Sequence, residues 1–210
     1  MKDVTECYKI VTSKVNFDIN AGMNVDMSIP LSELIPSIVE HIDNGGSGCC
    51  LHSAIYMCKL LNDRGIYSEL IATPEPTVLP DGTSRTDLRA SVLYYDSKES
   101  KYYVANPIED AEAFTRDGIS SQDRLKYYDE ESGILKLKKD NVYSEDGSRI
   151  LLEDYVNRYG NGVGYQFGTL FGEDKEVLSF SDIMRTVLTI DLNDIQEIND
   201  RFGIPIKPGM

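Results

Sequence analysis

The chain has 210 residues and a formal net charge of −14 at pH 7, with 41% apolar and 27% charged residues. This composition is typical of a globular protein large enough to bury a core. The negative charge repels phosphate backbones and anionic lipid, so we expect neither nucleic acid nor a membrane as a partner. The polar start of the sequence shows no signal peptide, and no apolar run approaches the ~18 residues of a membrane span.

Four cysteines, Cys7, Cys49, Cys50 and Cys58, lack the spacing of a disulfide framework. The adjacent pair Cys49 and Cys50 is a poor disulfide, because a ring of two residues strains the bond geometry. Free thiols are typical of a reducing compartment. We therefore expect a cytoplasmic protein.

The first predicted helix covers residues 31–46 (LSELIPSIVEHIDNGG), whereas residues 1–30 mix short extended runs such as YKIVTSKV with Asn and Gly. The apolar residues of the helix recur at the i, i+3/i+4 spacing of an amphipathic helix. They are Leu34, Ile35, Ile38, Val39 and Ile42. Pro36 is expected in the first turn, and Asn44 with the two following glycines ends the helix.

A second helix is predicted from about residue 48, with Ser47 or Gly48 as its cap and Gly65 at its end. Its apolar stripe is made by Cys50, Ala54, Met57, Cys58 and Leu61. Residues 66–73 then favour a strand and residues 74–87 a loop. A β-hairpin follows, in which 88–95 and 101–105 flank the polar turn DSKES.

The remaining sequence predicts a short helix at 109–114, one or two strands within 133–143 and a helix at 149–160. A glycine-rich stretch follows, and residues 179–205 predict one or two closing helices. We expect a single domain over 1–210, with a core at about 31–145 and a helical and glycine-rich C-terminal segment at about 146–210.

Several sites for cofactors and metals are excluded by spacing. GNGVGYQFG (160–168) lacks the Gly-Lys-Ser/Thr ending of a phosphate loop and follows a helix rather than a strand. DLNDIQEINDRF has Gln196 and Phe202 where an EF-hand loop needs Gly and Glu. Cys50 and Cys58 are separated by roughly 12 Å of helical rise, too far to share zinc. No cofactor and no metal are expected.

The start of the second helix is the candidate for chemistry. A cysteine in the first helical turn gains thiolate character from the free N–H groups and the helix dipole. Cys50 is preferred over Cys49, because it is in register with Ala54 and Met57 on the face expected to pack on the strands. The alternative is that Cys50 is a small buried apolar residue.

Residues 48–71 (GCCLHSAIYMCKLLNDRGIYSELI) resemble the nucleophile helix of the transglutaminase-like branch of the papain-fold superfamily. The matched positions are Gly48, Cys50, Ala54, Leu60, Leu61, Gly65 and Ile66. The hairpin resembles the next part of that fold, at Val92, Tyr102, Tyr103, Val104 and Pro107. The resemblance covers residues 45–110. It implies an α+β fold, with a nucleophile helix packed on an antiparallel sheet and a partly helical C-terminal extension.

Two positions depart from the pattern of the family. Asn106 stands at the position of its aspartate, and an amide can still orient an imidazole. Arg89 stands at the position of its histidine, and arginine cannot act as a general base. His52 lies two residues after Cys50 and points to another face of the helix. The turn that follows His41 either brings the His41 side chain back near Cys50 or leaves His41 on the surface.

Three functions remain open from the sequence. The first is cysteine acyl transfer or amide hydrolysis on a peptide, protein or small acyl or amide substrate. In it, Cys50 is the nucleophile, Asn106 the orienting residue, and Arg89 stabilises the thiolate or binds an anionic group. The second is a catalytically inactive scaffold of the same fold that binds a peptide or protein. The third is a binding or regulatory protein whose resemblance is accidental. The oligomeric state stays open.

Overall fold

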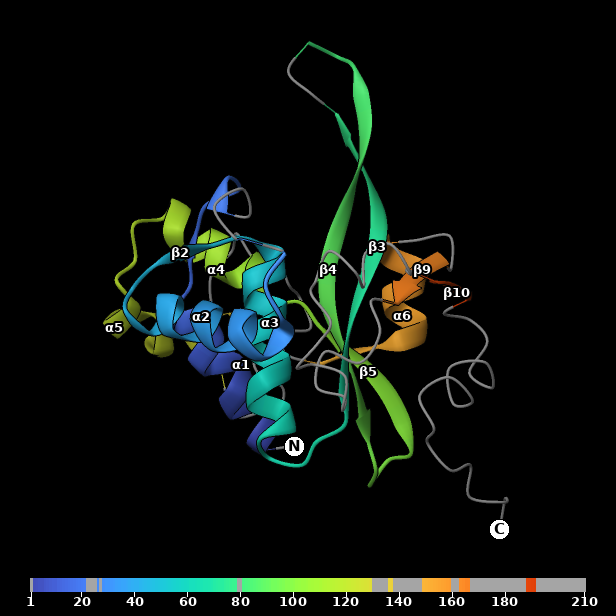
Figure 1. The fold of residues 1–210 in the computed structure, drawn as a ribbon, viewed down its shortest axis with the longest axis horizontal. Helices are drawn as coiled ribbons and strands as arrows, with labels where there is room; N and C mark the ends of the chain where they lie inside the picture. The colour runs from blue at the N-terminus through green and yellow to red at the C-terminus, as the bar shows by residue number, and fades with distance from the viewer. Residues whose placement is uncertain are drawn as a thin grey trace.

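A computed structural model describes residues 2–21, 26, 28–78, 81–129, 136–137, 149–159, 163–166 and 188–191. Helices gather on one side of an antiparallel sheet, and a smaller group of elements covers the other side (Figure 1). The expected α+β class is therefore confirmed. The helices are α1 (Lys2–Lys14), α2 (Leu31–Asp43), α3 (Cys50–Asn62), α4 (Pro107–Arg116), α5 (Ser121–Arg124) and α6 (Leu152–Tyr159).

The main sheet has six strands in the order β10-β9-β3-β4-β5-β8, and all its neighbouring pairs are antiparallel. These strands are β3 (Ser68–Val78), β4 (Ser84–Asp96), β5 (Lys101–Ala105), β8 (Ile150–Leu151), β9 (Val163–Gln166) and β10 (Leu188–Asp191). Two short pairs lie apart from it: β1 (Asn16–Phe17) with β2 (Ser47–Gly48), and β6 (Tyr128–Asp129) with β7 (Lys136–Leu137). The hairpin predicted at 88–95 and 101–105 is confirmed as β4 and β5.

Helix α1 replaces the extended structure expected in the first 30 residues. Its buried residues recur at helical spacing and make one apolar stripe. They are Val4, Cys7, Tyr8 and Val11, with Val15 just past the end. The buried guanidinium of Arg124 fastens this end by donating to the carbonyl oxygens of Thr12 (3.0 Å) and Val15 (2.7 Å).

Helices α2 and α3 occur where the sequence predicts them, but their first turns differ from the expectation. Helix α2 begins at Leu31, as predicted, but the exposed Pro36 lies inside the helix and not in its first turn. The cap of α3 is Cys49, and not Ser47 or Gly48, because those two residues pair with β1 as strand β2. Gly65 ends α3 in the left-handed conformation (φ 71°), as expected.

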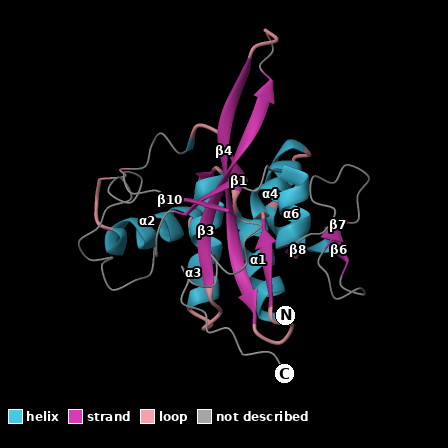
Figure 2. Ribbon diagram, turned by 90° about the vertical axis from the view of Figure 1, so that its right-hand side faces the viewer, coloured by secondary structure: helices cyan, strands magenta, loops and turns pink. Residues whose placement is uncertain are grey.

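Strands β3 and β4 are longer than the sequence indicates. The residues expected to form a loop at 74–87 continue the ladder, with Pro74 opposite Leu88 and Pro76 opposite Thr86. In the described part of the chain, β9 pairs with β3 only at Ile71 and Ala72, so the prolines lie where an edge strand needs no N–H donor. The distal parts of β3 and β4 extend as a two-stranded arm beyond the helices (Figures 1 and 2).

The C-terminal segment contributes strands as well as a helix, so the expectation of a helical segment was incomplete. Within the predicted helix at 149–160, Ile150–Leu151 form β8 before α6 begins. Within 179–205 the described residues, Leu188–Asp191, are a strand and not a helix. The other residues predicted there, and most of 133–143, lie outside the described residues.

Helix α3 occupies the centre of the fold. It packs against β3 and β4 on one side and against α1, α2 and α4 on the other (Figure 1). A second, smaller apolar cluster lies on the opposite face of the sheet, where Leu93 and Val104 meet Tyr155 of α6. Among the helices described, none has both the length and the apolar character to cross a bilayer.

Candidate active site at the start of helix α3

The two adjacent cysteines lie where strand β2 turns into helix α3. Cys49 is the N-cap, with extended backbone angles (φ −103°, ψ −171°), and Cys50 is the first helical residue. Both side chains are half-buried. The Ser53 N–H is bonded to the Cys49 carbonyl oxygen (3.2 Å), as in the first regular turn of the helix. The N–H groups before it point out of the helix toward the cysteines.

Cys49 is paired with His52 across the first turn. The Cys49 Sγ lies 3.3 Å from the Nδ1 of His52, and the Cys49 backbone N–H donates to the same nitrogen (3.4 Å). The pKa of the Cys49 thiol is lowered to about 4. The main cause is a hydrogen bond from the Cys50 thiol; His52 and the N–H of Leu51 add to it, and burial opposes it. Cys49 is thus held as a thiolate.

The pKa of the Cys50 thiol shifts in the opposite direction to that of Cys49. Its pKa is raised, first by the hydrogen bond to Cys49 and then by burial. The N–H of Ala90 and the charge of Arg89 act in the other direction but do not overcome this effect. Two interacting thiols lose their protons in two steps that belong to the pair. We place the first negative charge on Cys49, because His52 and the Leu51 N–H both stabilise it there.

Arg89 and Asn106 meet at a buried carboxylate, Glu109, which the sequence analysis did not identify. Oε1 of Glu109 accepts from Nη1 of Arg89 and from Nδ2 of Asn106, both at 2.9 Å. Glu109 is 4% exposed and Asn106 is fully buried, and Asn106 Oδ1 has no hydrogen-bond partner among the described residues. Asn106 is the N-cap of α4, so the first turn of that helix returns the side chain of Glu109 toward it.

The two histidines of the chain lie side by side near the cysteines. Nε2 of His41 donates to the Ser47 carbonyl oxygen (2.9 Å), and the ring centres of His41 and His52 are 6.3 Å apart. The glycines between them make this approach possible. A Cβ at Gly46 would lie 2.4 Å from the His41 ring, and one at Gly48 would lie 2.9 Å from the Cβ of His52.

The site residues predicted from sequence are thus near one another. The positive charge of Arg89 acts to lower the pKa of Cys50. Arg89 and Asn106 both donate to the carboxylate of Glu109. The contact between Cys49 and His52 was missed, because His52 was compared only with Cys50. Spacing of i and i+3 between a cap residue and the third helical residue is the signal that identifies it. Cys50 as the nucleophile remains a prediction.

No protein-family model matches the chain, and no curated protein matches it in sequence. No group of three or more His, Cys, Asp or Glu side chains in the described part of the chain is arranged to hold a metal ion. Function is therefore inferred from the geometry of the thiol pair and its neighbours.

Proposed function

We propose that the chain is a transglutaminase-like cysteine acyltransferase or amide hydrolase, in which the Cys49 thiolate, rather than Cys50, attacks the substrate. The contact of 3.3 Å between Cys49 Sγ and His52 Nδ1 carries this proposal. A nucleophile within hydrogen-bond reach of a base is the arrangement required for covalent acyl transfer. The lowered pKa of Cys49 supports it, because the thiolate is the reactive form.

Each proton in this reaction has a place in the site. The thiolate attacks the carbonyl carbon of an amide, and the oxyanion forms near the free N–H groups at the start of α3. Nδ1 of His52 takes the proton of the Cys49 thiol, in place of accepting the Cys49 N–H, and then gives that proton to the leaving nitrogen, so that a thioester on Cys49 remains. His52 then removes a proton from water or from a second nucleophile, whose attack releases the acyl product and restores the Cys49 thiolate with protonated His52.

The other polar residues set the charge around this pair. The Cys50 thiol donates to the thiolate of Cys49, so it acts as a local hydrogen-bond donor. Arg89 adds positive charge beside Cys50, and Glu109 fixes the guanidinium. The resemblance noted in the sequence gives the nucleophile as Cys50, so the proposed Cys49 lies one residue earlier, at the start of the same helix packed on β3 and β4.

A non-catalytic scaffold of the same fold is the second candidate. The observation that favours it is the bonding of Arg89 and Asn106 to one buried carboxylate, where the family has its histidine and aspartate. In this case the three side chains stabilise the junction of β4, β5 and α4, and the protein binds a peptide or protein without turnover.

Alkylation of the four cysteines at a series of pH values, followed by fragment mass spectrometry, tests the proposal. We expect Cys49 to react with a midpoint near pH 4, far below the ordinary value of about 8.5. Cys7 and Cys58 are internal controls, because burial raises the pKa of both thiols. A midpoint for Cys49 above about 8 contradicts the proposal.

Turnover distinguishes the enzyme from the scaffold. A panel of amides, esters and thioesters is assayed with the native chain and with the Cys49→Ala and Cys50→Ala variants. Turnover lost with Cys49 and largely kept without Cys50 supports the proposed nucleophile. Turnover that depends on Cys50 alone supports Cys50 as the nucleophile, as expected from the sequence. Absence of turnover with a reactive Cys49 favours the scaffold.

A further inference from the structure

A pocket of about 450 Å³ lies beside the thiol pair, between helix α2 and the start of α3. Its lining includes two carboxylates, Asp18 and Asp26, and both histidines of the chain. Neither cysteine lines the pocket. It also lies on the α2 side of His52, whereas Arg89 and Asn106 belong to β4 and the end of β5. The pocket is therefore a site separate from the cluster of Arg89 and Glu109.

His52 presents an unused donor to this pocket. The side chain is 2% exposed, and its Nδ1 faces Cys49. The nitrogens of an imidazole lie on different edges of the ring, and no residue that the structure describes is bonded to Nε2. Because Nδ1 accepts the Cys49 N–H, the proton of the neutral ring is on Nε2. The pocket therefore contains a buried donor at Nε2 of His52.

The two carboxylates supply negative charge that no described basic side chain neutralises. Oδ1 of Asp18 accepts from the N–H of Asn20, and Oδ1 of Asp26 accepts from Ser28. The second oxygen of each has no hydrogen bond with the described residues, and neither aspartate forms an ion pair with them. A cationic group in the pocket is attracted by the charge of both carboxylates, and a charge-assisted hydrogen bond is among the stronger polar contacts.

The rest of the lining that matters here is aliphatic. Ile29, Leu34 and Ile38 contribute apolar side chains, and Leu34 and Ile38 also belong to the core of the protein. Their positions in the core make this wall rigid. The pocket thus combines an aliphatic wall with polar and charged groups, so it suits a ligand that carries both an apolar side chain and a charge.

We infer that this pocket binds an aliphatic α-amino amide, the group at the amino terminus of a peptide. The ammonium bonds to Asp18 and Asp26, the aliphatic side chain lies on the wall of Ile29, Leu34 and Ile38, and the carbonyl oxygen accepts from Nε2 of His52. The carboxylates select against a free carboxylate on the ligand. This binding needs no thiol reaction, so it stands or fails independently of the proposed acyl transfer.

Titration with leucinamide, followed by nuclear magnetic resonance of the histidine rings, tests the inference. The chain has only two histidines and both line the pocket, so each ring signal reports on it. We expect a saturable shift of the His52 ring signals, with a dissociation constant of about 1 mM or tighter. N-acetyl-leucinamide, which lacks the positive charge, is expected to bind about tenfold or more weakly.

Matched variants locate the binding. Asp18→Asn and Asp26→Asn are each expected to weaken leucinamide binding about tenfold. Glu40→Gln, an exposed carboxylate of α2 outside the pocket lining, is expected to change nothing. Asp26 is exposed, so its variant retains the fold and decides the outcome alone if Asp18→Asn does not fold. No saturable shift, equal binding of the acetylated compound, or no effect of Asp26→Asn overturns the inference.

Discussion

The two ends of helix α3 carry the same kind of atom in opposite chemical states. At the N-terminal end, hydrogen bonds lower the pKa of Cys49 to about 4. Near the C-terminal end, Cys58 is fully buried, and its pKa is raised by burial and then by the charge of Glu69. Burial raises the pKa of both thiols, so it is not what distinguishes them.

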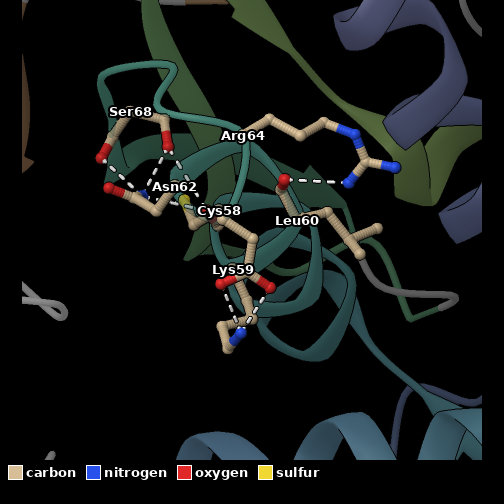
Figure 3. Close-up of polar contacts among 7 residues, drawn as sticks. Cys58, Lys59, Leu60, Asn62, Arg64 and Ser68 are labelled. Atoms are coloured by element: carbon tan, nitrogen blue, oxygen red, sulfur yellow. Dashed lines mark hydrogen bonds and ion pairs between the residues drawn. The ribbon is translucent and has the colours of Figure 1, made fainter.

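Helix direction and local donors explain the difference. The free N–H groups at the start of α3 point toward Cys49, and the helix dipole favours negative charge there. At the other end the exposed groups are carbonyl oxygens, and side chains already bind them (Figure 3). Nδ2 of Asn62 donates to the Cys58 oxygen (2.9 Å), and Nη1 of Arg64 donates to the Leu60 oxygen (3.0 Å). These surroundings favour the thiolate at one end of the helix and the protonated thiol at the other.

The largest expected effect is on turnover. Replacing the nucleophile removes the covalent step, so Cys49→Ala should lower kcat of any accepted substrate by about 10⁴-fold or more. Cys58→Ala should leave kcat nearly unchanged and lower stability instead. Steady-state kinetics on the two purified variants make the comparison directly. Equal losses of kcat in Cys49→Ala and Cys58→Ala would show that the difference in pKa between the two thiols does not matter for turnover.

The next effect concerns the thiolate itself. Cys50→Ala removes the main donor to Cys49, so the alkylation midpoint of Cys49 should rise by about 2 to 3 pH units, and His52→Gln should raise it somewhat less. A lowered thiol pKa in the folded state stabilises the fold above the ordinary thiol pKa of 9.0, and this contribution decreases as the pH falls toward 4. The difference in free energy of unfolding between the native chain and Cys49→Ala, measured with denaturant between pH 9 and 4, should follow that sign, because groups such as Glu69 titrate equally in both chains.

Glu69 provides a test at the Cys58 end. Burial raises the pKa of its carboxyl from 4.5 to about 7, although the Tyr67 hydroxyl donates to it (3.2 Å). The folded state therefore holds this proton more tightly, so the contribution of Glu69 to stability is fully present below pH 4.5 and is lost as the pH rises through 7. Glu69→Gln should be more stable than the native chain at pH 8 by about 3 kcal/mol.

The matched control for that change is Glu40→Gln, an exposed carboxylate on α2. Urea unfolding at pH 4 and pH 8 measures both variants. The gain of Glu69→Gln should be present at pH 8 and nearly absent at pH 4. A gain of equal size at both pH values would mean that the charge of Glu69 is not its cause.

The smallest effect is on the capping of α3 at its C-terminal end. Asn62 donates to the Cys58 carbonyl oxygen and to the Ser68 hydroxyl, both at 2.9 Å. Asn62→Ala should therefore lower the free energy of unfolding by about 1 kcal/mol. Lys59→Ala, which removes only the exposed ion pair with Asp63, should cost about 0.5 kcal/mol or less. Thermal unfolding ranks the two, and the reverse order would contradict this view of the helix end.

Periodicity predicted the elements whose burial is one-sided. Helix α2, helix α3 and the β4–β5 hairpin fall where the apolar spacing indicates them. The distal part of β3 and β4 was missed, because Pro74 and Pro76 favour loops in most settings and only an edge position permits them in a strand. Residues 188–191 were assigned to a helix, because a short apolar run fits both periods until its partner β9 is known.

The candidate site was predicted by segment rather than by atom. The sequence located the chemistry at the start of α3, with Arg89 and Asn106 as neighbours. It favoured Cys50 because the apolar stripe gives its register. The contact of Cys49 with His52 depends on Cys49 being the cap, and that depends on the pairing of Gly48 with Phe17. The role of Glu109 depends on the direction of its side chain in the first turn of α4, and the spacing of apolar residues does not predict that direction.

The hydrogen bonds of Arg124 join parts of the chain that are synthesised far apart in time. Its guanidinium holds the carbonyl oxygens of Thr12 and Val15, which are 112 and 109 positions earlier in the chain. The end of α1 therefore gains these bonds only after residue 124 has been made, although α3 and α4, which pack against α1, are synthesised earlier. A nascent chain that stalls before residue 124 lacks the donor for these two carbonyl oxygens.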